Sequence, residues 1–243
     1  QMCIRDRFSD VGDSSSTMLQ EFDGVVTLFL DDDSYTISTE GDNLVITPSD
    51  SELSHSTSSD VAVFAGHQSD YTFASSPDGL TVTVTDRSTG DADTVRNVET
   101  LSFDDGSIGV SHDGTGLVLT GQSADSIEVV GSVGVTVLGQ EDNDTLTGGS
   151  GADTLEGGSG NDTLTGGAGS DDIMGGDGSD VAVFAGAMSA FTFSVSSDGT
   201  LTVTDTNAGA SLGIDTVSGV EALQFTDGVL TVTTLSDGRV TLT

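Results

Sequence analysis

Residues 139–183 read GQEDNDTLT GGSGADTLE GGSGNDTLT GGAGSDDIM GGDGSDVAV, which is five blocks of nine residues in an unbroken row. Glycine opens each block, an aspartate stands sixth and an apolar residue stands eighth. One block is long enough for a strand and a turn, but it cannot bury its few apolar atoms alone. The blocks must therefore stack on one another, and a fixed short period is typical of a solenoid.

The chemistry of the block favours a hard metal ion. Glycines at the first, second and fourth positions permit left-handed backbone angles, so carbonyl groups can turn inward around a small sphere. The sixth-position aspartate adds a carboxylate to these carbonyls, and such a set of oxygen ligands suits calcium and suits softer metals badly. The Thr-Leu-Thr or Thr-Leu-Glu that follows alternates polar and apolar residues, as a short strand with one buried face does.

This pattern resembles the calcium-binding nonapeptide of the RTX (repeats-in-toxin) family. The resemblance implies an all-β fold, a parallel β-roll or β-solenoid with calcium-binding turns, in which each Ca²⁺ lies between turns two blocks apart on one edge. Asp144, Asp162 and Asp180 would line one edge, and Asp153 and Asp171 the other, which gives three complete sites and partial ones at the ends. The implied metal ligands also include the turn glycines Gly148, Gly149, Gly151, Gly157, Gly158, Gly160, Gly166, Gly167, Gly169, Gly175, Gly176 and Gly178.

Two features qualify this interpretation. In the first block Gln140 and Asp142 replace glycines, so this block departs from the pattern. The alternative for the whole stretch is a flexible Gly/Ser/Asp linker that binds no metal. A linker, however, has no reason to keep leucine or isoleucine in phase with aspartate at a nine-residue spacing, so we favour the roll.

Composition excludes several classes of partner. The 243 residues include 40 Asp and Glu against five Lys and Arg, a net charge of −35. This charge argues against nucleic acid and against anionic membrane surfaces, both of which require a basic patch. No run of eighteen or more apolar residues exists, so no membrane span is predicted. Only ten of the acids lie between Gly139 and Asp180, and the remainder indicate a strongly solvated secreted surface.

The N-terminal part of the chain divides into two segments. Residues 1–7, QMCIRDR, resemble the translation of the end of a sequencing-library transposon, and we interpret them as an adapter artefact on an environmental gene fragment. Cys3, the single cysteine, would then not belong to the native protein. The alternative is a genuine N-terminal peptide. We interpret residues 8–58 as an eroded β unit and linker, because YTISTEGDNLVIT at 35–47 has strand-like alternation around a turn.

A longer repeat organises the flanks. SDVAVFAG occurs at 59–66 and again at 179–186, and each copy continues through a predicted hairpin, at Asp78-Gly79 or Asp198-Gly199, to a closing strand and a Phe-x-Asp-Gly turn. We therefore predict a first cap-like β unit at 59–106, metal-free solenoid coils at 107–138, the calcium-binding roll at 139–183, and a second cap-like unit with a C-terminal hairpin at 184–243. The phenylalanines predicted to be buried are Phe64, Phe73 and Phe103 in the first copy and Phe184, Phe193 and Phe225 in the second.

Two candidate sites outside the nonapeptides are weak. Asp60 keeps its place in the first SDVAVFAG copy, but SELSHSTSS precedes it in place of glycine-rich blocks, so we do not expect it to bind calcium. Asp125 with Ile127 only faintly resembles a block. Neither is assigned as a ligand.

No catalytic motif emerges. The three histidines His55, His67 and His112 stand far apart without HExxH spacing, and no Gly-x-Ser-x-Gly or phosphate-binding loop occurs. We therefore do not expect this chain to be an enzyme, although sequence missing upstream could hold a catalytic domain. No cofactor other than Ca²⁺ is indicated.

Two functions are compatible with these features. The first is calcium binding that drives the folding of a secreted bacterial protein, with this chain as the C-terminal module of a larger exported protein; the resemblance implies the type I secretion machinery as a partner. The second is a structural or adhesive protein of the extracellular matrix or cell surface, built from repeated β units, with an unknown partner at that surface. Both place the protein outside the cell.

Overall fold

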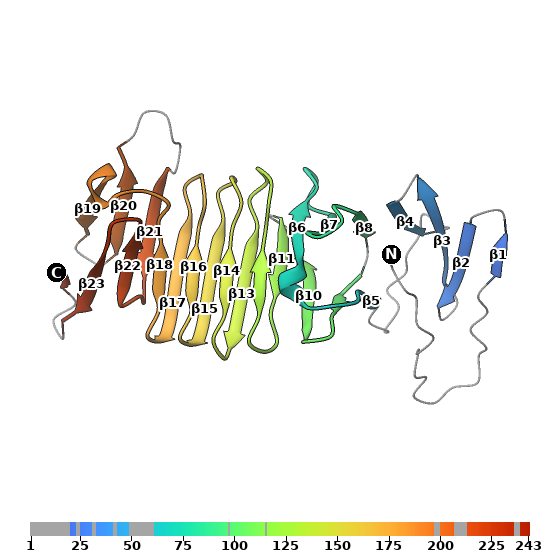
Figure 1. The fold of residues 1–243 in the computed structure, drawn as a ribbon, viewed down its shortest axis with the longest axis horizontal. Coiled ribbons are helices and arrows are strands. Elements are labelled where there is room, and N and C mark those ends of the chain that lie inside the picture. The colour runs from blue at the N-terminus through green and yellow to red at the C-terminus, as the bar shows by residue number, and fades with distance from the viewer. Residues whose placement is uncertain are drawn as a thin grey trace.

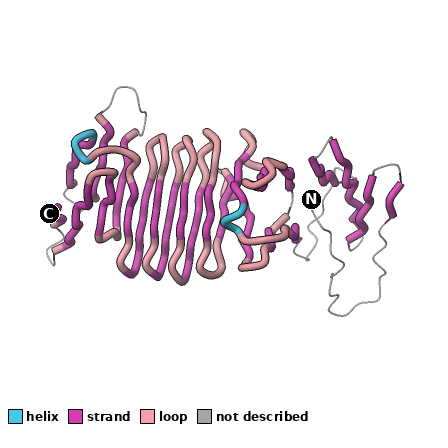
Figure 2. The backbone as a smooth tube through the Cα atoms, in the orientation of Figure 1, coloured by secondary structure: helices cyan, strands magenta, loops and turns pink. Residues whose placement is uncertain are grey.

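The computed structural model describes residues 61–96, 98–114, 116–196, 200–206, 213–235 and 239–243, together with the backbone of four strands nearer the N-terminus. Within these residues the regular structure is β except for two short 3₁₀ helices, η1 (Gln68–Asp70) and η2 (Met188–Ala190) (Figure 2). The prediction of an all-β protein is confirmed. None of its helices is long and apolar enough to span a bilayer in the described part of the chain.

The centre of the molecule is a parallel β-roll made of two facing sheets (Figure 1). Within the roll, successive strands alternate between the sheets, so that each strand pairs in parallel with the next roll strand of its own sheet. One sheet contains β11 (Leu117–Thr120), β13 (Thr136–Glu141), β15 (Thr154–Gly160), β17 (Asp172–Gly178) and β21 (Ile214–Ser218). The other contains β12 (Ser126–Glu128), β14 (Thr145–Thr147), β16 (Thr163–Thr165), β18 (Val181–Val183) and β22 (Ala222–Phe225).

The core of the roll is a column of eighth-position side chains. In the five blocks these are Leu146, Leu155, Leu164, Ile173 and Ala182, and each is 0% exposed. The register aligns them within each sheet, with Leu146 opposite Leu164 and Leu155 opposite Ile173. A nine-residue period thus places one aliphatic side chain per strand between the sheets, as the alternation of the sequence predicts.

Two β units with the same topology flank the roll. The first contains β5 (Val61–Val63), β6 (Tyr71–Ser75), β7 (Thr81–Asp86), β8 (Ala92–Arg96), β9 (Thr100–Ser102) and β10 (Ser107–His112). The second contains β18, β21 and β22, which it shares with the roll, and four further strands: β19 (Phe191–Val195), β20 (Leu201–Asp205), β23 (Gly228–Thr234) and β24 (Val240–Leu242). In the first unit β5 pairs in parallel with β9, as β18 does with β22 in the second. Antiparallel β6, β7 and β8 correspond to β19, β20 and β21.

Aromatic packing repeats along with the topology. The rings of Phe64 and Phe103 stack with centroids 5.4 Å apart and planes at 18°, and those of Phe184 and Phe225 with centroids 5.6 Å apart and planes at 17°. Five of the six predicted phenylalanines are buried, and Phe193 is half-buried. The 120-residue repeat in the sequence is therefore a repeat of structure. The first predicted hairpin lies between β6 and β7, with Gly79 at φ 71°, and the second, at Asp198-Gly199, lies outside the described residues.

The first unit also closes the N-terminal end of the roll. Phe73 in β6 forms a parallel bridge with Val129 beside β12, and the Val130 N–H donates to the Phe73 carbonyl over 2.7 Å. This contact buries Phe73 completely, whereas its counterpart Phe193 is half-buried on β19, which lies at the edge of its sheet among the described strands. The sequence predicts solenoid coils from residue 107. Strand β10, however, pairs antiparallel with both of its neighbours in the chain, β9 and β11, so it is a hairpin strand and not a parallel coil. Parallel stacking begins at β11.

Four further strands lie in the segment predicted as an eroded unit. They are β1 (Gln20–Phe22), β2 (Val25–Leu30), β3 (Asp33–Glu40) and β4 (Asn43–Pro48), which pair antiparallel in chain order. Strand β4 also pairs in parallel with β8 through Val45 and Thr94. Residues 1–7, His55 and Asp60 lie outside the described residues.

Candidate metal centre

The five sixth-position aspartates lie at the two edges of the roll, immediately before its strands. Asp144, Asp162 and Asp180 precede β14, β16 and β18 of one sheet, and Asp153 and Asp171 precede β15 and β17 of the other. All five are buried, with exposed fractions of at most 2%. The two-block alternation expected from the sequence thus places the carboxylates in two rows, one per edge.

Each row is held together by hydrogen bonds from backbone to side chain. The Asp144 N–H donates to Asp162 Oδ1 over 2.8 Å, and the Asp162 N–H donates to Asp180 Oδ1 over 2.8 Å. On the other edge the Asp153 N–H donates to Asp171 Oδ1 over 2.9 Å. One oxygen of each acceptor carboxylate therefore ties successive coils together, and the other is left for a different partner.

The second carboxylate oxygens lack a partner in most of these turns. Within the described residues, the buried side-chain oxygens without any hydrogen bond are the Oδ2 atoms of Asp144, Asp162, Asp171 and Asp180. Asp153 differs, because its Oδ2 accepts the Gly149 N–H over 2.8 Å. A buried carboxylate oxygen without a donor is unfavourable, so these four atoms indicate a missing positive partner.

The first-position glycines mark where that partner would lie. A methyl group on Gly139 would come closer than 3.0 Å both to Asp144 Oδ2 and to the carbonyl oxygen of Gly157, one coil further on. The same pair of oxygens, one carboxylate and one carbonyl, faces Gly148 and Gly157. Any side chain here would fill the space between them, so glycine keeps open a small cradle lined by oxygen.

Glycines at the second and fourth positions allow neighbouring turns to approach closely. A methyl group on Gly158 or Gly160 would come closer than 3.0 Å to the carbonyl oxygen of Gln140 or Asp142 in the preceding coil. In the first block Gln140 and Asp142 themselves adopt φ of 85° and 76°. The first block therefore keeps the glycine-like backbone even though its residues are not glycine, a conformation that is unfavourable for them.

Burial without a counter-ion changes the acidity of the carboxylates. Loss of hydration raises the pKa of Asp144 to about 7 and the pKa of Asp171 to about 6, although backbone hydrogen bonds oppose the change. Burial likewise raises the pKa values of Asp153 and Asp180. In the absence of a cation these side chains favour the neutral form, and a bound divalent ion would reverse that preference.

The donor set fits calcium. No three His, Cys, Asp or Glu side chains converge on one point among the described residues, so backbone carbonyls must supply part of any coordination shell. Each cradle offers a carboxylate oxygen and a carbonyl oxygen from the next coil, and both are hard ligands. Calcium accepts six to eight such oxygens in flexible geometry, which suits a turn of glycines better than the strict octahedron of Mg²⁺ does.

Coils beyond the nonapeptides continue the rows of acidic side chains, although the nine-residue pattern does not predict them. The Asp171 N–H donates to Asp215 Oδ1 over 2.9 Å, and the Asp180 N–H donates to Glu221 Oε2 over 2.8 Å. A signal was present, since 213–219 reads GIDTVSG and has glycine, aspartate, valine and glycine at the fourth, sixth, eighth and first positions of a block. The long hairpin β19–β20 separates this partial block from the others, so the block does not follow them at the nine-residue spacing.

Hydrogen bonds within the protein close the N-terminal ends of the rows. Val135 stands where an aspartate would, and its N–H donates to Asp153 Oδ1 over 2.9 Å. On the other edge Asp125 joins the row, and its N–H donates to Asp144 Oδ1 over 2.8 Å. Asp125 Oδ2, however, accepts the N–H groups of Gln122 and Ser123. This segment therefore resembles a block in its backbone arrangement, but its second carboxylate oxygen already has partners.

Gln68 completes this end by imitating a peptide group. Its Nε2 donates to Asp125 Oδ1 over 2.6 Å, and its Oε1 accepts the Ser126 N–H over 3.2 Å. In the coils above, the N–H and C=O of an aspartate one coil earlier fill these two roles, as Asp125 does for Asp144 and Thr145. The second β unit has Met188 at the equivalent place in its sequence, and a methionine side chain cannot replace this amide.

Replacing Gln68 by Met, the residue of the second unit, should destabilise the N-terminal end of the roll by about 1–3 kcal/mol, because Asp125 and Ser126 would each lose a buried partner. Urea unfolding in saturating calcium measures the change. Gln122→Met is the control, since Gln122 is exposed nearby and should alter stability by less than about 0.5 kcal/mol. Equal effects of the two substitutions would contradict this role of Gln68.

Comparison with known proteins agrees with the geometry of these turns. The family described as "RTX calcium-binding nonapeptide repeat (4 copies)" matches residues 136–164 and 147–182. Residues 136–182 are RTX calcium-binding repeats. The RTX repeats thus cover β13 to β18 without the last residue of that strand, and the two β units lie outside the matched residues.

One solved structure similar to the chain is the extracellular lipase LipA from Serratia marcescens, with 18% sequence identity. The match covers 68% of this chain and 31% of the lipase, with a TM-score of 0.21. This chain therefore spans about a third of the length of that protein. No curated protein matches the chain.

Proposed function

We propose that the RTX repeats bind Ca²⁺ between turns two blocks apart and that binding folds the roll. The complete sites would use the pairs Asp144 and Asp162, Asp153 and Asp171, and Asp162 and Asp180, with carbonyl oxygens of the turn glycines. The observation that carries this proposal is the set of buried Oδ2 atoms without a partner, each facing a first-position glycine.

Without calcium, two terms oppose folding of these turns. Buried carboxylates within one row repel each other and lose their hydration, and the glycine-rich turns lose more backbone entropy than other residues on ordering. A bound Ca²⁺ would neutralise the carboxylates and tie two coils together, so its binding free energy would become folding free energy. The thin core of one aliphatic side chain per strand supplies little stabilisation of its own.

The proposed setting is a secreted bacterial protein, at the cell surface or free in the medium. Extracellular calcium modules respond at roughly 10⁻⁴–10⁻³ M, far above the calcium level of a cytosol. The chain would therefore stay unfolded inside the cell, could pass through the type I secretion machinery, and would fold outside. In this role it would be the C-terminal module of a larger exported protein.

Circular dichroism during a calcium titration tests the proposal. Calcium-free protein at pH 8 should lack the β-sheet signal of the roll and gain it cooperatively, with a midpoint of roughly 0.1–1 mM. Asp162→Ala should raise this midpoint, because Asp162 takes part in two of the proposed sites.

Asp60→Ala is the matched control, since Asp60 precedes VAVFAG as Asp180 does but follows no glycine-rich block. Its midpoint should equal that of the unmodified chain. An unchanged spectrum between zero and about 10 mM calcium would contradict coupled folding, and equal effects of the two substitutions would contradict the assignment of the sites.

A structural or adhesive role is the second candidate, and the repeated β unit favours it. The two copies share topology and aromatic stacking, and they stand at opposite ends of the roll. Such an array could serve as a stalk or a matrix component. Further copies of the 120-residue unit in the full reading frame would favour this role, and an upstream catalytic motif would favour the module of an exported enzyme.

A further inference from the structure

The four unpartnered oxygens do not all face another nonapeptide. Asp144 Oδ2 faces the carbonyl of Gly157, which opens the nonapeptide ending at Thr165, and Asp162 Oδ2 faces the carbonyl of Gly175 in the last block. Asp171 and Asp180 stand in the last turn of each edge, and the next coil there belongs to the second β unit. Two of the four unpartnered oxygens thus belong to coils whose next neighbour carries no complete RTX block.

On one edge, the second β unit presents Asp215 at the place of a sixth-position aspartate. Asp215 is 4% exposed, and its Oδ1 accepts the Asp171 N–H just as Asp171 Oδ1 accepts the Asp153 N–H. The fourth position agrees, because a methyl group on Gly213 would come closer than 3.0 Å to the Gly169 carbonyl, as one on Gly169 would to the Gly151 carbonyl. Strand β21 therefore begins with the geometry of a nonapeptide turn.

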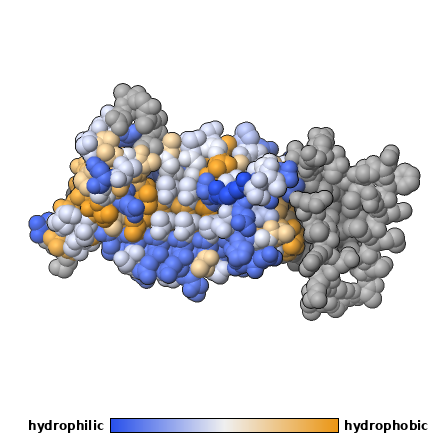
Figure 3. Space-filling model, viewed as in Figure 1, coloured by the Kyte–Doolittle hydropathy of each residue, from blue (hydrophilic) through white to orange (hydrophobic). Residues whose placement is uncertain are grey.

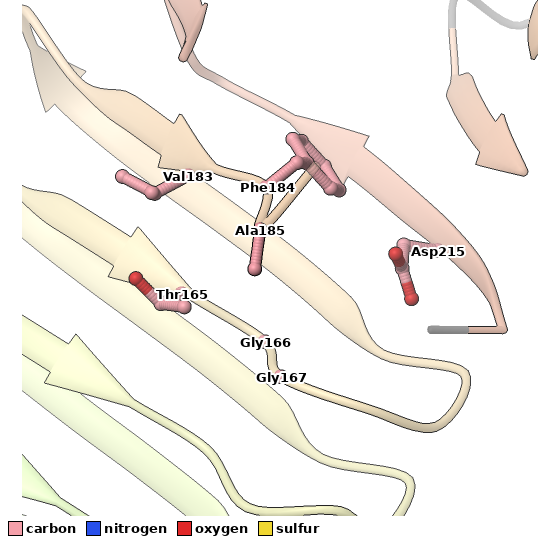
Figure 4. A pocket seen from close by; sticks show the side chains of 7 residues that line it. All are labelled: Thr165, Gly166, Gly167, Val183, Phe184, Ala185 and Asp215. Carbon is pink, nitrogen blue, oxygen red and sulfur yellow. The ribbon is translucent and has the colours of Figure 1, made fainter. Parts of the chain in front are cut away.

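A small cavity lies beside these residues. It is lined by Gly166 and Gly167 of the last turn on this edge, by Asp215, and by Thr165 and Val183–Ala185 of the facing sheet, and its volume is about 50 Å³ (Figure 4). Asp171 Oδ2 faces Gly166, one of the lining residues, and is buried without a hydrogen-bond partner. Its volume suffices for one water molecule or ion, and Asp215 is the lining residue with a charged side chain.

On the other edge, the second β unit supplies a carbonyl group. A methyl group on Gly175 would come closer than 3.0 Å both to Asp180 Oδ2 and to the Gly219 carbonyl oxygen. This repeats the pairing at Gly157, where Asp162 Oδ2 and the Gly175 carbonyl meet. Glu221 accepts the Asp180 N–H in the place of the next aspartate. Both edges of the second unit therefore continue the pattern of the roll.

We propose that the second β unit completes two additional calcium sites, with Asp215 joining Asp171 on one edge and the Gly219 carbonyl joining Asp180 on the other. This rests on the proposed function, because it extends the same kind of site by one coil on each edge. The chain would then bind five calcium ions, the three between complete repeats and these two. The terminal ions would also attach the second unit to the roll, so that its docking depends on calcium.

Counting the bound ions tests the proposal. Native mass spectrometry and calorimetric titration of the full chain with calcium chloride should give five ions. Asp215→Asn keeps an Oδ1 acceptor for the Asp171 N–H but removes the charge. It should bind four ions, or bind the fifth about tenfold more weakly or worse, a difference of roughly 1.4 kcal/mol.

Asp93→Asn is the matched control. Asp93 opens the same Asp-Thr-Val sequence in the first β unit, but its strand β8 lies between β4 and β7 and, in the described residues, pairs with no strand of the roll. This variant should still bind five ions. Three ions in the unmodified chain, or an unchanged count and affinity in Asp215→Asn, would overturn the proposal, whereas no bound ions at all would overturn the proposed function itself.

A second variant covers the case in which Asp215→Asn does not fold. Asp215→Glu keeps the carboxylate but displaces its oxygens by one methylene group. If Asp215 binds calcium, Asp215→Glu should raise the midpoint of the calcium titration at least threefold. The final circular dichroism signal at saturating calcium should be unchanged. A midpoint equal to that of the unmodified chain would overturn the role of Asp215.

Discussion

Gly158→Ala should destabilise the calcium-bound roll by roughly 2–5 kcal/mol. Gly158 has φ 110°, and a methyl group on it would come closer than 3.0 Å to the carbonyl oxygen of Gln140. The backbone angle alone costs roughly 1–2 kcal/mol for alanine. The methyl group would clash with backbone atoms, which cannot move away because β13 and β15 are paired at this point. The clash adds about 1–3 kcal/mol. Thermal unfolding in 10 mM calcium, followed by circular dichroism, measures the total.

Gly131→Ala separates the two contributions. Gly131 has φ 109°, nearly the angle of Gly158, but a methyl group there would meet no atom within 4 Å. This control should therefore lose only the roughly 1–2 kcal/mol of the left-handed backbone. If both variants lost the same stability, the close approach of neighbouring turns would not be the reason for glycine at the second position.

The roll was predictable because three independent signals share one phase. Glycine, aspartate and an aliphatic residue recur together every nine positions in 139–183, and each signal specifies a different part of the coil. The turn needs glycine for close approach, the edge needs the carboxylate, and the core needs Leu164 or its equivalent. Because every part of the coil is specified locally, its contacts follow from sequence spacing alone.

The ends of the roll were not predictable in this way, since their contacts join residues far apart in the chain. Gln68 meets Asp125 across 57 positions, and Asp171 meets Asp215 across 44. The hairpin β19–β20 separates Asp215 from the other aspartates of its row. Gly121 stands four residues before Asp125, whereas the first glycine of a full block stands five residues before its aspartate. Local periodicity is lost in both cases, although the fold restores the coil.

The dual use of each carboxylate also could not be read from the sequence. The pattern places an aspartate at each turn, but it does not show that Oδ1 accepts a backbone N–H of the preceding coil. Only one oxygen of Asp144, Asp162, Asp171 or Asp180 is then left without a partner. Calcium affinity in these turns should therefore be sensitive to coil stacking as well as to charge.

Acid should partly replace calcium in folding the roll. Burial raises the pKa of Asp144 to about 7 and the pKa of Asp171 to about 6 in the calcium-free fold, whereas an aspartate in an unfolded chain titrates near 3.9. The folded state therefore binds protons more tightly than the unfolded state. Stability from these groups is fully present below about pH 4 and is lost as the pH rises through about 6 to 7.

Calcium-stripped protein should accordingly show more β-sheet signal at pH 5 than at pH 8, and the gain produced by calcium should be larger at pH 8. Asp144→Asn imitates the protonated side chain, so without calcium at pH 8 it should be more structured than the unmodified chain. Glu156→Gln removes one charge from an exposed position in β15 and controls for general charge repulsion. Equal signals at the two pH values, or equal effects of the two variants, would show that buried carboxylates are not what keeps the calcium-free roll unfolded.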